Sequence, residues 1–179
     1  MANYTRRLII DTFSDMLERM PFDKITVTAL IKECNVGRNT FYYHYEDIYA
    51  LLDDAMAQWI EQYVDATQDM TWQEVLKSIL YTCRTNKSKI YHIFNSLSRD
   101  QLMQYIFGKI EAPINAYIQT LSEEEYDDPK QAEVIGDVFG YAISGYFMHF
   151  LWNDMEDDID ENVKNLGIIF DILFDSLEA

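Results

Sequence analysis

Apolar side chains recur at intervals of three and four residues along most of the chain, which is the spacing of amphipathic α-helices. The first segment shows this pattern from Leu8 to Met20, and Pro21 ends it because proline cannot continue a helix. No segment shows the strict alternation expected of a β-strand. The sequence therefore predicts an all-α fold. Further long helices are expected at residues 48–68, 72–84, 87–97, 100–121, 129–153 and 159–177.

Two short helices separated by a turn are predicted after the first helix. Thr26 can cap one of them, Val27–Cys34, because its hydroxyl can accept a hydrogen bond from a free backbone amide. Asn35 suits a left-handed turn conformation, and Gly37 can cap the other short helix, Arg38–Tyr45. Two short helices joined by a turn of about three residues have helix-turn-helix geometry.

The second short helix lies within VGRNTFYYHY, residues 36–45, which is rich in both polar and aromatic side chains. Val36, Phe41 and Tyr45 can face inward, which leaves a row of hydrogen-bond donors and flat rings outside. Such a row suits a helix in the DNA major groove, and the amino end of the preceding helix can bind phosphate. The alternative is that the tyrosines pack as core beneath a second domain. The predicted DNA-binding residues are Arg6, Thr26, Val27, Thr28, Arg38, Asn39, Thr40, Tyr42, Tyr43 and His44.

The run ITVTALIKECNVGRNTFYYHYEDIYALL, residues 25–52, resembles the DNA-binding domain of the TetR family of bacterial transcriptional regulators. It has a threonine before the first short helix, the small residue Cys34 that closes it, the TFYYHY recognition helix and a Leu-Leu pair after an acidic cap. The resemblance implies an N-terminal three-helix helix-turn-helix DNA-binding domain over residues 1–46. It also implies an all-helical ligand-binding and dimerisation domain over residues 47–179.

Two positions depart from the family pattern. Ile48 stands where many members have a lysine that binds a DNA phosphate, so that contact is expected to be lost or replaced. Gly37 stands where serine or alanine is frequent, which weakens the cap slightly without arguing against the fold.

Charge is distributed unevenly, and the asymmetry indicates which part of the chain can approach DNA. Residues 1–50 contain six basic and seven acidic residues, a net charge of −1 out of −17 for the whole chain. The remaining residues have a net charge of −16. Only the N-terminal third is therefore expected to approach a polyanion, with modest and strongly salt-dependent affinity.

Composition places the chain among globular proteins, since 49% of its residues are hydrophobic and 15% are aromatic. Cys34 and Cys83 form no CxxC pattern, so neither a disulfide framework nor a thiolate zinc site is indicated, and a reducing cytoplasm fits. The apolar N-terminal run is broken by Asp11, too early for a signal peptide. The longest uncharged stretch, Val138–Asn153, has 16 residues. Since roughly 20 are needed to span a bilayer, we expect a buried helix and no membrane partner.

The last two helices are predicted to pair with those of a second copy. The final helix has apolar residues at alternating gaps of three and four, the spacing of a helix-pairing seam, and the preceding helix is apolar nearly all round. A homodimer with a four-helix bundle would cover these faces, as the resemblance also implies, whereas the alternative is a monomer with a thick core. The predicted interface residues are Val138, Tyr141, Gly145, Met148, Trp152, Val163, Leu166, Phe170, Leu173 and Leu177.

Aromatic residues of the middle helices are candidates for an effector pocket, because small-molecule pockets are mostly apolar with few polar anchors. Each of them taken alone is explained more simply as core. His92 and His149 are explained more simply as ordinary packed or exposed histidines than as metal ligands, and no cofactor is indicated. The predicted pocket residues, for a flat or hydrophobic small molecule, are Trp59, Tyr63, Tyr81, Tyr91, Phe94, Phe107, Tyr117 and Phe147.

These features predict a one-component transcriptional regulator, most simply a repressor that a small-molecule effector releases from a pseudo-palindromic double-stranded DNA operator. Effector binding would shift the fourth helix, which begins after Asp47, and so change the separation of the recognition helices in a dimer. An enzyme finds no support, since the sequence has no phosphate loop, nucleophile elbow or metal-spaced histidine pair. An activator, or a protein-interaction module that retains the fold and binds DNA only with a ligand or partner, stays open as the alternative.

Overall fold

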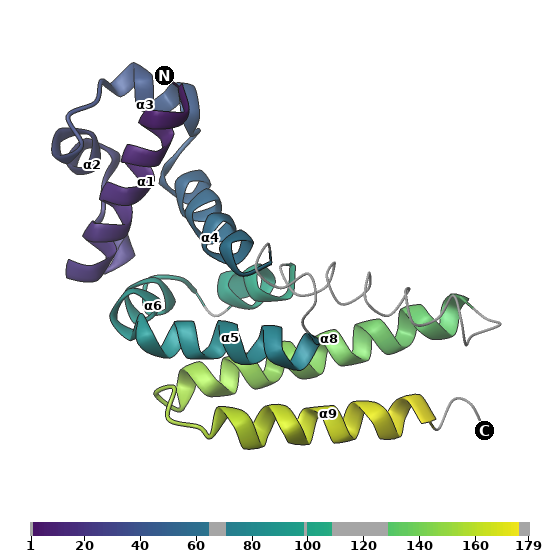
Figure 1. The fold of residues 1–179 in the computed structure, drawn as a ribbon. Helices are drawn as coiled ribbons and strands as arrows, with labels where there is room; N and C mark the ends of the chain where they lie inside the picture. The colour runs from purple at the N-terminus through teal and green to yellow at the C-terminus, as the bar shows by residue number, and fades with distance from the viewer. Residues whose placement is uncertain (1, 65–70, 99, 109–128, 176–179) are drawn as a thin grey trace. The chain divides into compact units, whose positions relative to one another are not determined.

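The computed structural model describes residues 2–64, 71–98, 100–108 and 129–175. All regular elements within these ranges are helices, and no strand occurs among them (Figure 1). The prediction of an all-α fold is therefore confirmed.

The described helices belong to two compact units, Met1–Leu97 and Ser98–Ala179. These units are defined by packing. The expected boundary between residues 46 and 47 separates a DNA-binding domain from a ligand-binding and dimerisation domain, and it stays a prediction. The first unit contains α1 (Ala2–Arg19), a 3₁₀ turn (Phe22–Lys24), α2 (Val27–Glu33), α3 (Arg38–His44), α4 (Ile48–Val64), α5 (Trp72–Thr85) and α6 (Lys87–Phe94). The second contains a helical segment at residues 100–108, α8 (Pro129–Trp152) and α9 (Ile159–Asp175).

The turn between α2 and α3 follows from the residues that form it. Thr26 caps α2, since its side-chain oxygen accepts a hydrogen bond from the Ala29 amide at 3.1 Å. Asn35 has a φ of 52°, the left-handed conformation that asparagine tolerates better than most residues. Gly37 precedes α3 in an extended conformation. Each short helix ends one residue earlier than predicted, which is within the usual uncertainty of helix ends.

A shared apolar core holds α1 to α4 together and also includes one residue of α6. The rings of Phe13 and Phe22 meet edge to face with their centroids 6.1 Å apart, a favoured arrangement of aromatic pairs. Because short helices are marginal by themselves, α2 and α3 depend on this core for their stability. The buried residues are Ile9, Ile10, Phe13, Met16, Leu17, Phe22, Ile25, Leu30, Cys34, Phe41, Tyr45, Leu51, Leu52, Ala55 and Ile93.

In the second unit, α8 and α9 pack against each other and leave apolar side chains on their outer faces. Phe139 and Phe170 are buried between them with ring centroids 4.1 Å apart. The turn between the helices places Asp154 and Met155 at positive φ, and the Met155 side chain is fully buried. The exposed large apolar side chains are Val134, Val138, Tyr141 and Trp152 on α8 and Ile168, Ile169 and Ile172 on α9.

This burial corrects part of the predicted dimer interface. Met148, Val163 and Phe170 are at most 5% exposed inside the unit itself, so they do not present a surface to a second copy. Met148 lies on α8, which is apolar nearly all round, so its sequence does not reveal which side faces its own unit. Val163 and Phe170 lie on the apolar stripe of α9, and Phe170 of this stripe packs against Phe139 of the same chain's α8. Among the other predicted residues, Val138, Tyr141, Gly145 and Trp152 are exposed, Leu166 is partly buried, and Leu177 and the side chain of Leu173 lie outside the described residues.

One segment of α8, Val134–Trp152, is long and apolar enough to cross a membrane, with a mean hydropathy of 1.2. Length and composition alone are a weak criterion, because the core helices of globular proteins meet it as well. Of this apolar stretch, 44% is buried inside the structure, and Val138 and Tyr141 are among its exposed side chains.

Candidate nucleic-acid interface

The solvent-exposed face of α3 is polar and aromatic, because only two side chains of residues 38–45 are buried in the core of the first unit. Phe41 and Tyr45 are 0% and 5% exposed, as predicted, and they lie one helical turn apart. Tyr42 and Tyr43 are 50% and 79% exposed, so they do not pack as core within the structure. The other exposed residues of α3 are Arg38, Asn39 and Thr40, and His44 is partly buried.

The amino end of α2 lies beside α3 and is linked to it by a hydrogen bond. Arg38 Nη2 donates to Thr28 Oγ1 at 2.9 Å, and both residues are exposed. Thr26 is exposed as well, although its side-chain oxygen already caps α2, and Val27 is partly buried. The parts of α2 and α3 that were predicted to contact DNA are therefore adjacent.

Four of the six basic residues in the N-terminal third are paired with carboxylates. Arg38 differs from these four, because its guanidinium contacts a neutral hydroxyl. A cation that is already paired must give up or share its carboxylate in order to bind a phosphate, so Arg38 is better placed for DNA than they are. The four ion pairs are Arg6 with Asp54, Arg7 with Asp11, Arg19 with Glu33 and Lys24 with Asp23.

Asp54 of α4 binds both Arg6 of α1 and Tyr45, the residue that ends α3. Arg6 donates to both carboxylate oxygens, with Nε 2.8 Å from Oδ2, and the Tyr45 hydroxyl donates to Oδ2 at 2.6 Å. This network of Arg6, Tyr45 and Asp54, the Asp54 triad, ties three helices together. Since the Arg6 guanidinium is engaged within the triad, the geometry favours a positioning role for Arg6, and its predicted DNA contact stays a prediction.

Sequence reasoning missed Asp54 because its only local signal is weak. Asp54 is an acidic residue beside the apolar stripe formed by Leu51, Leu52 and Ala55. Its partner Arg6 lies 48 residues away in the sequence. Spacing along one helix cannot reveal such a pair. The available signal is that an acidic residue so close to a buried apolar stripe needs a cationic or hydrogen-bonding partner.

Each member of the Asp54 triad has a shifted pKa. Burial raises the pKa of the Asp54 carboxyl, but the hydrogen bonds from Arg6 and Tyr45 outweigh burial, so the pKa lies below its ordinary value. Burial, followed by the hydrogen bond to Asp54, raises the pKa of the Tyr45 hydroxyl. The hydrogen bond to Asp54 raises the pKa of Arg6. The triad therefore keeps its ionised carboxylate, its cation and its protonated tyrosine throughout the neutral pH range.

The amino end of α4 is occupied by a carboxylate of the chain itself. Asp47 Oδ1 accepts hydrogen bonds from the Tyr49 and Ala50 amides, both at 2.8 Å. Ile48 is partly buried against the core of the first unit. This end of α4 therefore has a negative cap and an apolar side chain where a lysine would attract a phosphate.

The aromatic residues predicted to line an effector pocket divide between the two units. Trp59 packs against the core of α1 to α4, and Phe107 stacks on Tyr141 with ring centroids 4.6 Å apart. The pocket itself stays a prediction. Of its predicted residues, Trp59, Tyr81, Tyr91 and Phe94 belong to the first unit, Phe107 and Phe147 belong to the second, and Tyr117 and the side chain of Tyr63 lie outside the described residues.

The described residues were also compared with the requirements of a metal site and of a reactive thiol. Within the ranges that the structure describes, no group of three or more His, Cys, Asp or Glu side chains is placed to hold a metal ion. Cys34 and Cys83 are free and buried, and burial raises the pKa of the Cys83 thiol to about 12. The Cys83 thiol is therefore protonated at neutral pH.

Comparisons with known proteins agree with this arrangement. Residues 70–171 match a TetR-type family model described as "Transcriptional regulator C-terminal region". The fold is similar to the crystal structure of a TetR transcriptional regulator from Streptococcus agalactiae 2603V, with a TM-score of 0.65, 22% identity and 94% of each chain covered. It is also similar to a transcriptional regulator (TerR/AcrR family) from Aquifex aeolicus VF5, with a TM-score of 0.58, 18% identity, 94% of this chain covered and 99% of that chain. Curated proteins yield no match.

Replacing Asp54 with alanine should lower the free energy of unfolding by about 1–3 kcal/mol at neutral pH, because the buried Tyr45 hydroxyl loses its acceptor. The folded-state pKa of Asp54 is lowered. Its contribution is therefore fully present above the unfolded-state pKa of about 3.9 and is lost as the pH falls below that value. Urea unfolding followed by circular dichroism, from neutral pH into this acid range, measures both effects.

The matched control for this variant is Asp53→Ala, which removes an exposed carboxylate from the adjacent position. Its free energy of unfolding should stay within about 0.5 kcal/mol of wild type. Equal stability of the Asp54→Ala variant and wild type at neutral pH would contradict the role assigned to the triad.

Proposed function

Because this chain belongs to the TetR family of transcriptional regulators, a non-enzymatic family that binds DNA through a helix-turn-helix, we propose that it represses transcription from a pseudo-palindromic operator. In this proposal the protein binds the operator as a homodimer in the cytoplasm, and a small-molecule effector releases it. The observation that carries the proposal is the exposed face of α3, formed by Arg38, Asn39, Thr40, Tyr42 and Tyr43.

The chemistry of this face suits the DNA major groove. The groove is about 12 Å wide and admits one α-helix. Arg38 can donate two hydrogen bonds to a guanine edge, and Asn39 can pair with an adenine edge. The tyrosine hydroxyls and Thr28 can contact phosphates, which set the register of the protein on the duplex.

A homodimer is supported by the apolar outer faces of α8 and α9. Val138, Tyr141, Ile169 and Ile172 are each at least 50% exposed, and large exposed apolar patches usually mark interaction sites. A second copy with the same surface would cover them around a two-fold axis. Two recognition helices separated by one turn of DNA, about 34 Å, would then read two half-sites of a pseudo-palindrome.

Release by an effector requires a modest coupling between the C-terminal region and the DNA-binding helices. A coupling free energy of about 1–3 kcal/mol changes operator affinity by roughly 5- to 150-fold. α4 carries Asp54, so a shift of α4 would act directly on Arg6 and Tyr45. Movement of α4 would thereby change the position of α3.

The residues at the amino end of α4 favour one alternative, in which DNA binding depends on a ligand or partner. Asp47 and Ile48 supply no cation to a phosphate, so DNA binding by the free protein is expected to be weaker than in relatives with a lysine there. A protein of this kind could act as an activator or an interaction module that binds DNA only together with a ligand or partner.

Selection of bound sequences from a random duplex library at low salt tests the proposal. A two-fold symmetric motif is the expected result. No enrichment by the free protein, followed by enrichment after a metabolite extract is added, would favour the ligand-dependent activator. No enrichment in either case would contradict DNA recognition altogether.

Replacing Arg38 and Tyr42 together with alanine should weaken binding to the selected operator by at least about 30-fold, or 2 kcal/mol, because two contacts are lost. Fluorescence anisotropy with a labelled duplex measures the affinity. Both side chains are exposed, so the free energy of unfolding should change little.

Lys164→Ala is the charge control for this pair, since it removes an exposed cation from α9 of the second unit. It should leave the operator affinity unchanged. Wild-type affinity in the Arg38→Ala/Tyr42→Ala variant would refute the assigned contact surface.

Replacing Ile48 with lysine should make operator binding more sensitive to salt. One added phosphate contact steepens the slope of log Kobs against log salt concentration by about 0.9. Anisotropy titrations at several salt concentrations measure this slope. Ile48→Met, which adds no charge, should keep the wild-type slope, and an unchanged slope in the lysine variant would mean that this end of α4 does not approach a phosphate.

Replacing Ile172 or Tyr141 with aspartate should convert the homodimer to a monomer, because each places a charge within an apolar interface. Sedimentation velocity measures the mass, and operator binding should be lost in parallel. Ser88→Asp places the same charge at an exposed position of α6 and should leave the dimer intact. A monomeric wild-type protein, or dimeric aspartate variants, would contradict this assignment.

A further inference from the structure

The Arg38 side chain extends from the first residue of α3 back to α2. Its Nη2 donates to the Thr28 hydroxyl oxygen at 2.9 Å. Among the residues that the structure describes, Thr28 is the hydrogen-bond partner of this guanidinium. Both side chains are exposed, so the bond lies on the proposed DNA-binding surface and not beneath it.

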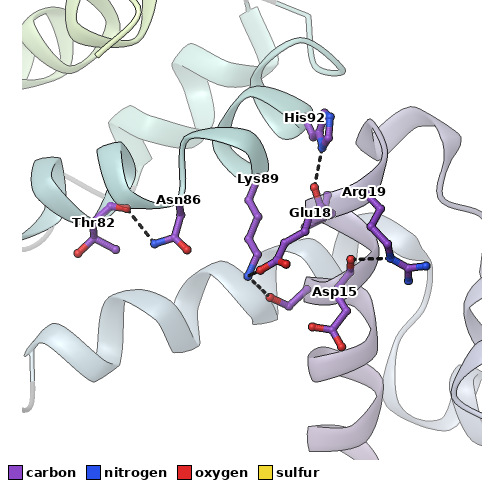
Figure 2. A network of polar contacts seen from close by, with 9 residues as sticks. Asp15, Glu18, Arg19, Thr82, Asn86, Lys89 and His92 are labelled. Carbon is purple, nitrogen blue, oxygen red and sulfur yellow. Dashed lines mark hydrogen bonds and ion pairs between the residues drawn. The ribbon is translucent and has the colours of Figure 1, made fainter. Parts of the chain in front are cut away.

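The neutral hydroxyl of Thr28 differs from the partners of several other cations in the first unit, which are carboxylates. Lys89 Nζ, for example, lies 2.8 Å from Glu18 Oε1 (Figure 2). A carboxylate in the place of Thr28 would hold the guanidinium but would also offset its charge and repel a nearby phosphate. Arg38 is therefore held in place and stays a full cation.

Thr28 itself has a defined position because α2 is anchored. The Thr26 hydroxyl caps α2 by accepting a hydrogen bond from the Ala29 amide at 3.1 Å, and Leu30 is fully buried. Threonine is β-branched, so few χ1 rotamers are open to it within a helix. The oxygen that accepts from Arg38 therefore occupies a defined place on the exposed side of α2.

The bond to Thr28 leaves the Arg38 guanidinium able to read a base. The Nη2 group belongs to two pairs of parallel N–H donors, one formed with Nε and the other with Nη1. Thr28 accepts only one of the two hydrogens of Nη2, so one of these pairs stays complete. A complete pair matches the O6 and N7 acceptors of guanine in the major groove.

We propose that Thr28 is a positioning residue that sets the guanine preference of Arg38, so that a residue of α2 determines specificity at one base pair of each half-site. This inference rests on the proposed function. In the free protein, Thr28 already orders the Arg38 side chain. Without the hydroxyl, Arg38 would have to become ordered only when guanine is bound, which should lower the guanine preference by roughly 2- to 12-fold.

The Thr28 hydroxyl can have a second effect that must be separated from this one. It accepts from Arg38, so its own proton is available to a DNA phosphate. Loss of a phosphate contact weakens binding to all sequences about equally, whereas loss of base readout relaxes the preference at one position. Measuring the base preference position by position therefore distinguishes the two effects.

Competition anisotropy with the full-length protein tests the inference. The competing duplexes carry the selected operator or a single base-pair substitution, made symmetrically in both half-sites, at each position in turn. Arg38→Ala identifies the base pair that Arg38 reads, since the guanine preference should be lost there alone. Thr28→Val removes the hydroxyl but keeps the branched shape. It should lower the preference at this same position by roughly 2- to 12-fold and leave the preferences at other positions unchanged.

Three further variants separate positioning from other effects of the substitution. Thr28→Ser keeps the hydroxyl and should keep the guanine preference. Thr28→Val/Arg38→Ala should show no loss of preference beyond that of Arg38→Ala, because Thr28 acts on the base only through Arg38. Thr85→Val, the same substitution at an exposed position of α5, should change neither affinity nor preference. If Thr28→Val is poorly folded by circular dichroism, Thr28→Ala takes its place.

Several outcomes would overturn the inference while leaving the proposed function intact. If Thr28→Val binds every duplex with wild-type affinity, or more weakly by one common factor, the hydroxyl has no part in base readout. If Thr28→Ser loses as much preference as Thr28→Val, the hydroxyl is not the cause. If Arg38→Ala loses no guanine preference, Arg38 reads no guanine for Thr28 to support. If no two-fold symmetric motif is selected at all, the proposed function itself fails, and the inference fails with it.

Discussion

The orientation of α3 depends on the hydrogen bonds that the Asp54 carboxylate accepts from Arg6 and Tyr45. α3 has seven residues, too few to be stable alone in water. Phe41 and Tyr45 anchor α3 by burial. Apolar burial is non-directional, so by itself it does not fix the orientation of a short helix. The Tyr45 hydroxyl and the Arg6 guanidinium meet at Asp54, and this fixes the end of α3 against both α1 and α4. The exposed row from Arg38 to Tyr43 is therefore held in a defined orientation before any DNA arrives.

Defined orientation matters more here than in a basic DNA-binding protein. The chain has a net charge of −17, and four of its N-terminal cations are already paired with carboxylates. Charge alone therefore attracts DNA weakly, and most of the discrimination must come from groups that fit base edges without rearrangement. The hydrogen bond from Arg38 to Thr28 places the guanidinium without neutralising it. The same shortage of charge makes DNA binding sensitive to a small displacement of α3, since few phosphate contacts are there to compensate for it.

Local features of the sequence were sufficient to predict the helices of the DNA-binding region and which side chains of α3 are buried or exposed. Thr26, Asn35 and Pro21 act within a few residues, so capping, turn and termination could be inferred from their chemistry. The inward positions of Phe41 and Tyr45 followed from helical spacing, and burial confirms both.

Contacts between distant segments could not be predicted in this way. Asp54 meets Arg6 across 48 residues, and Lys89 meets Ser14 across 75. The buried side of α8 was also ambiguous, because a helix that is apolar nearly all round shows little preference for one face; Met148 proved to be core while Tyr141 is exposed. The contact between α6 and α1 is of this distant kind, so the spacing of residues within either helix could not reveal it.

Methylation interference on the selected operator tests the central claim, that α3 reads DNA from the major groove. Guanine N7 lies in the major groove and adenine N3 in the minor groove, so premethylated duplexes distinguish the two modes of reading. We predict that methylation of guanine N7 at positions within each half-site, with the half-site centres about 10 base pairs or a multiple apart, blocks binding. Interference confined to adenine N3, or binding that is indifferent to methylation at every position, would contradict the assignment of α3 as the recognition helix.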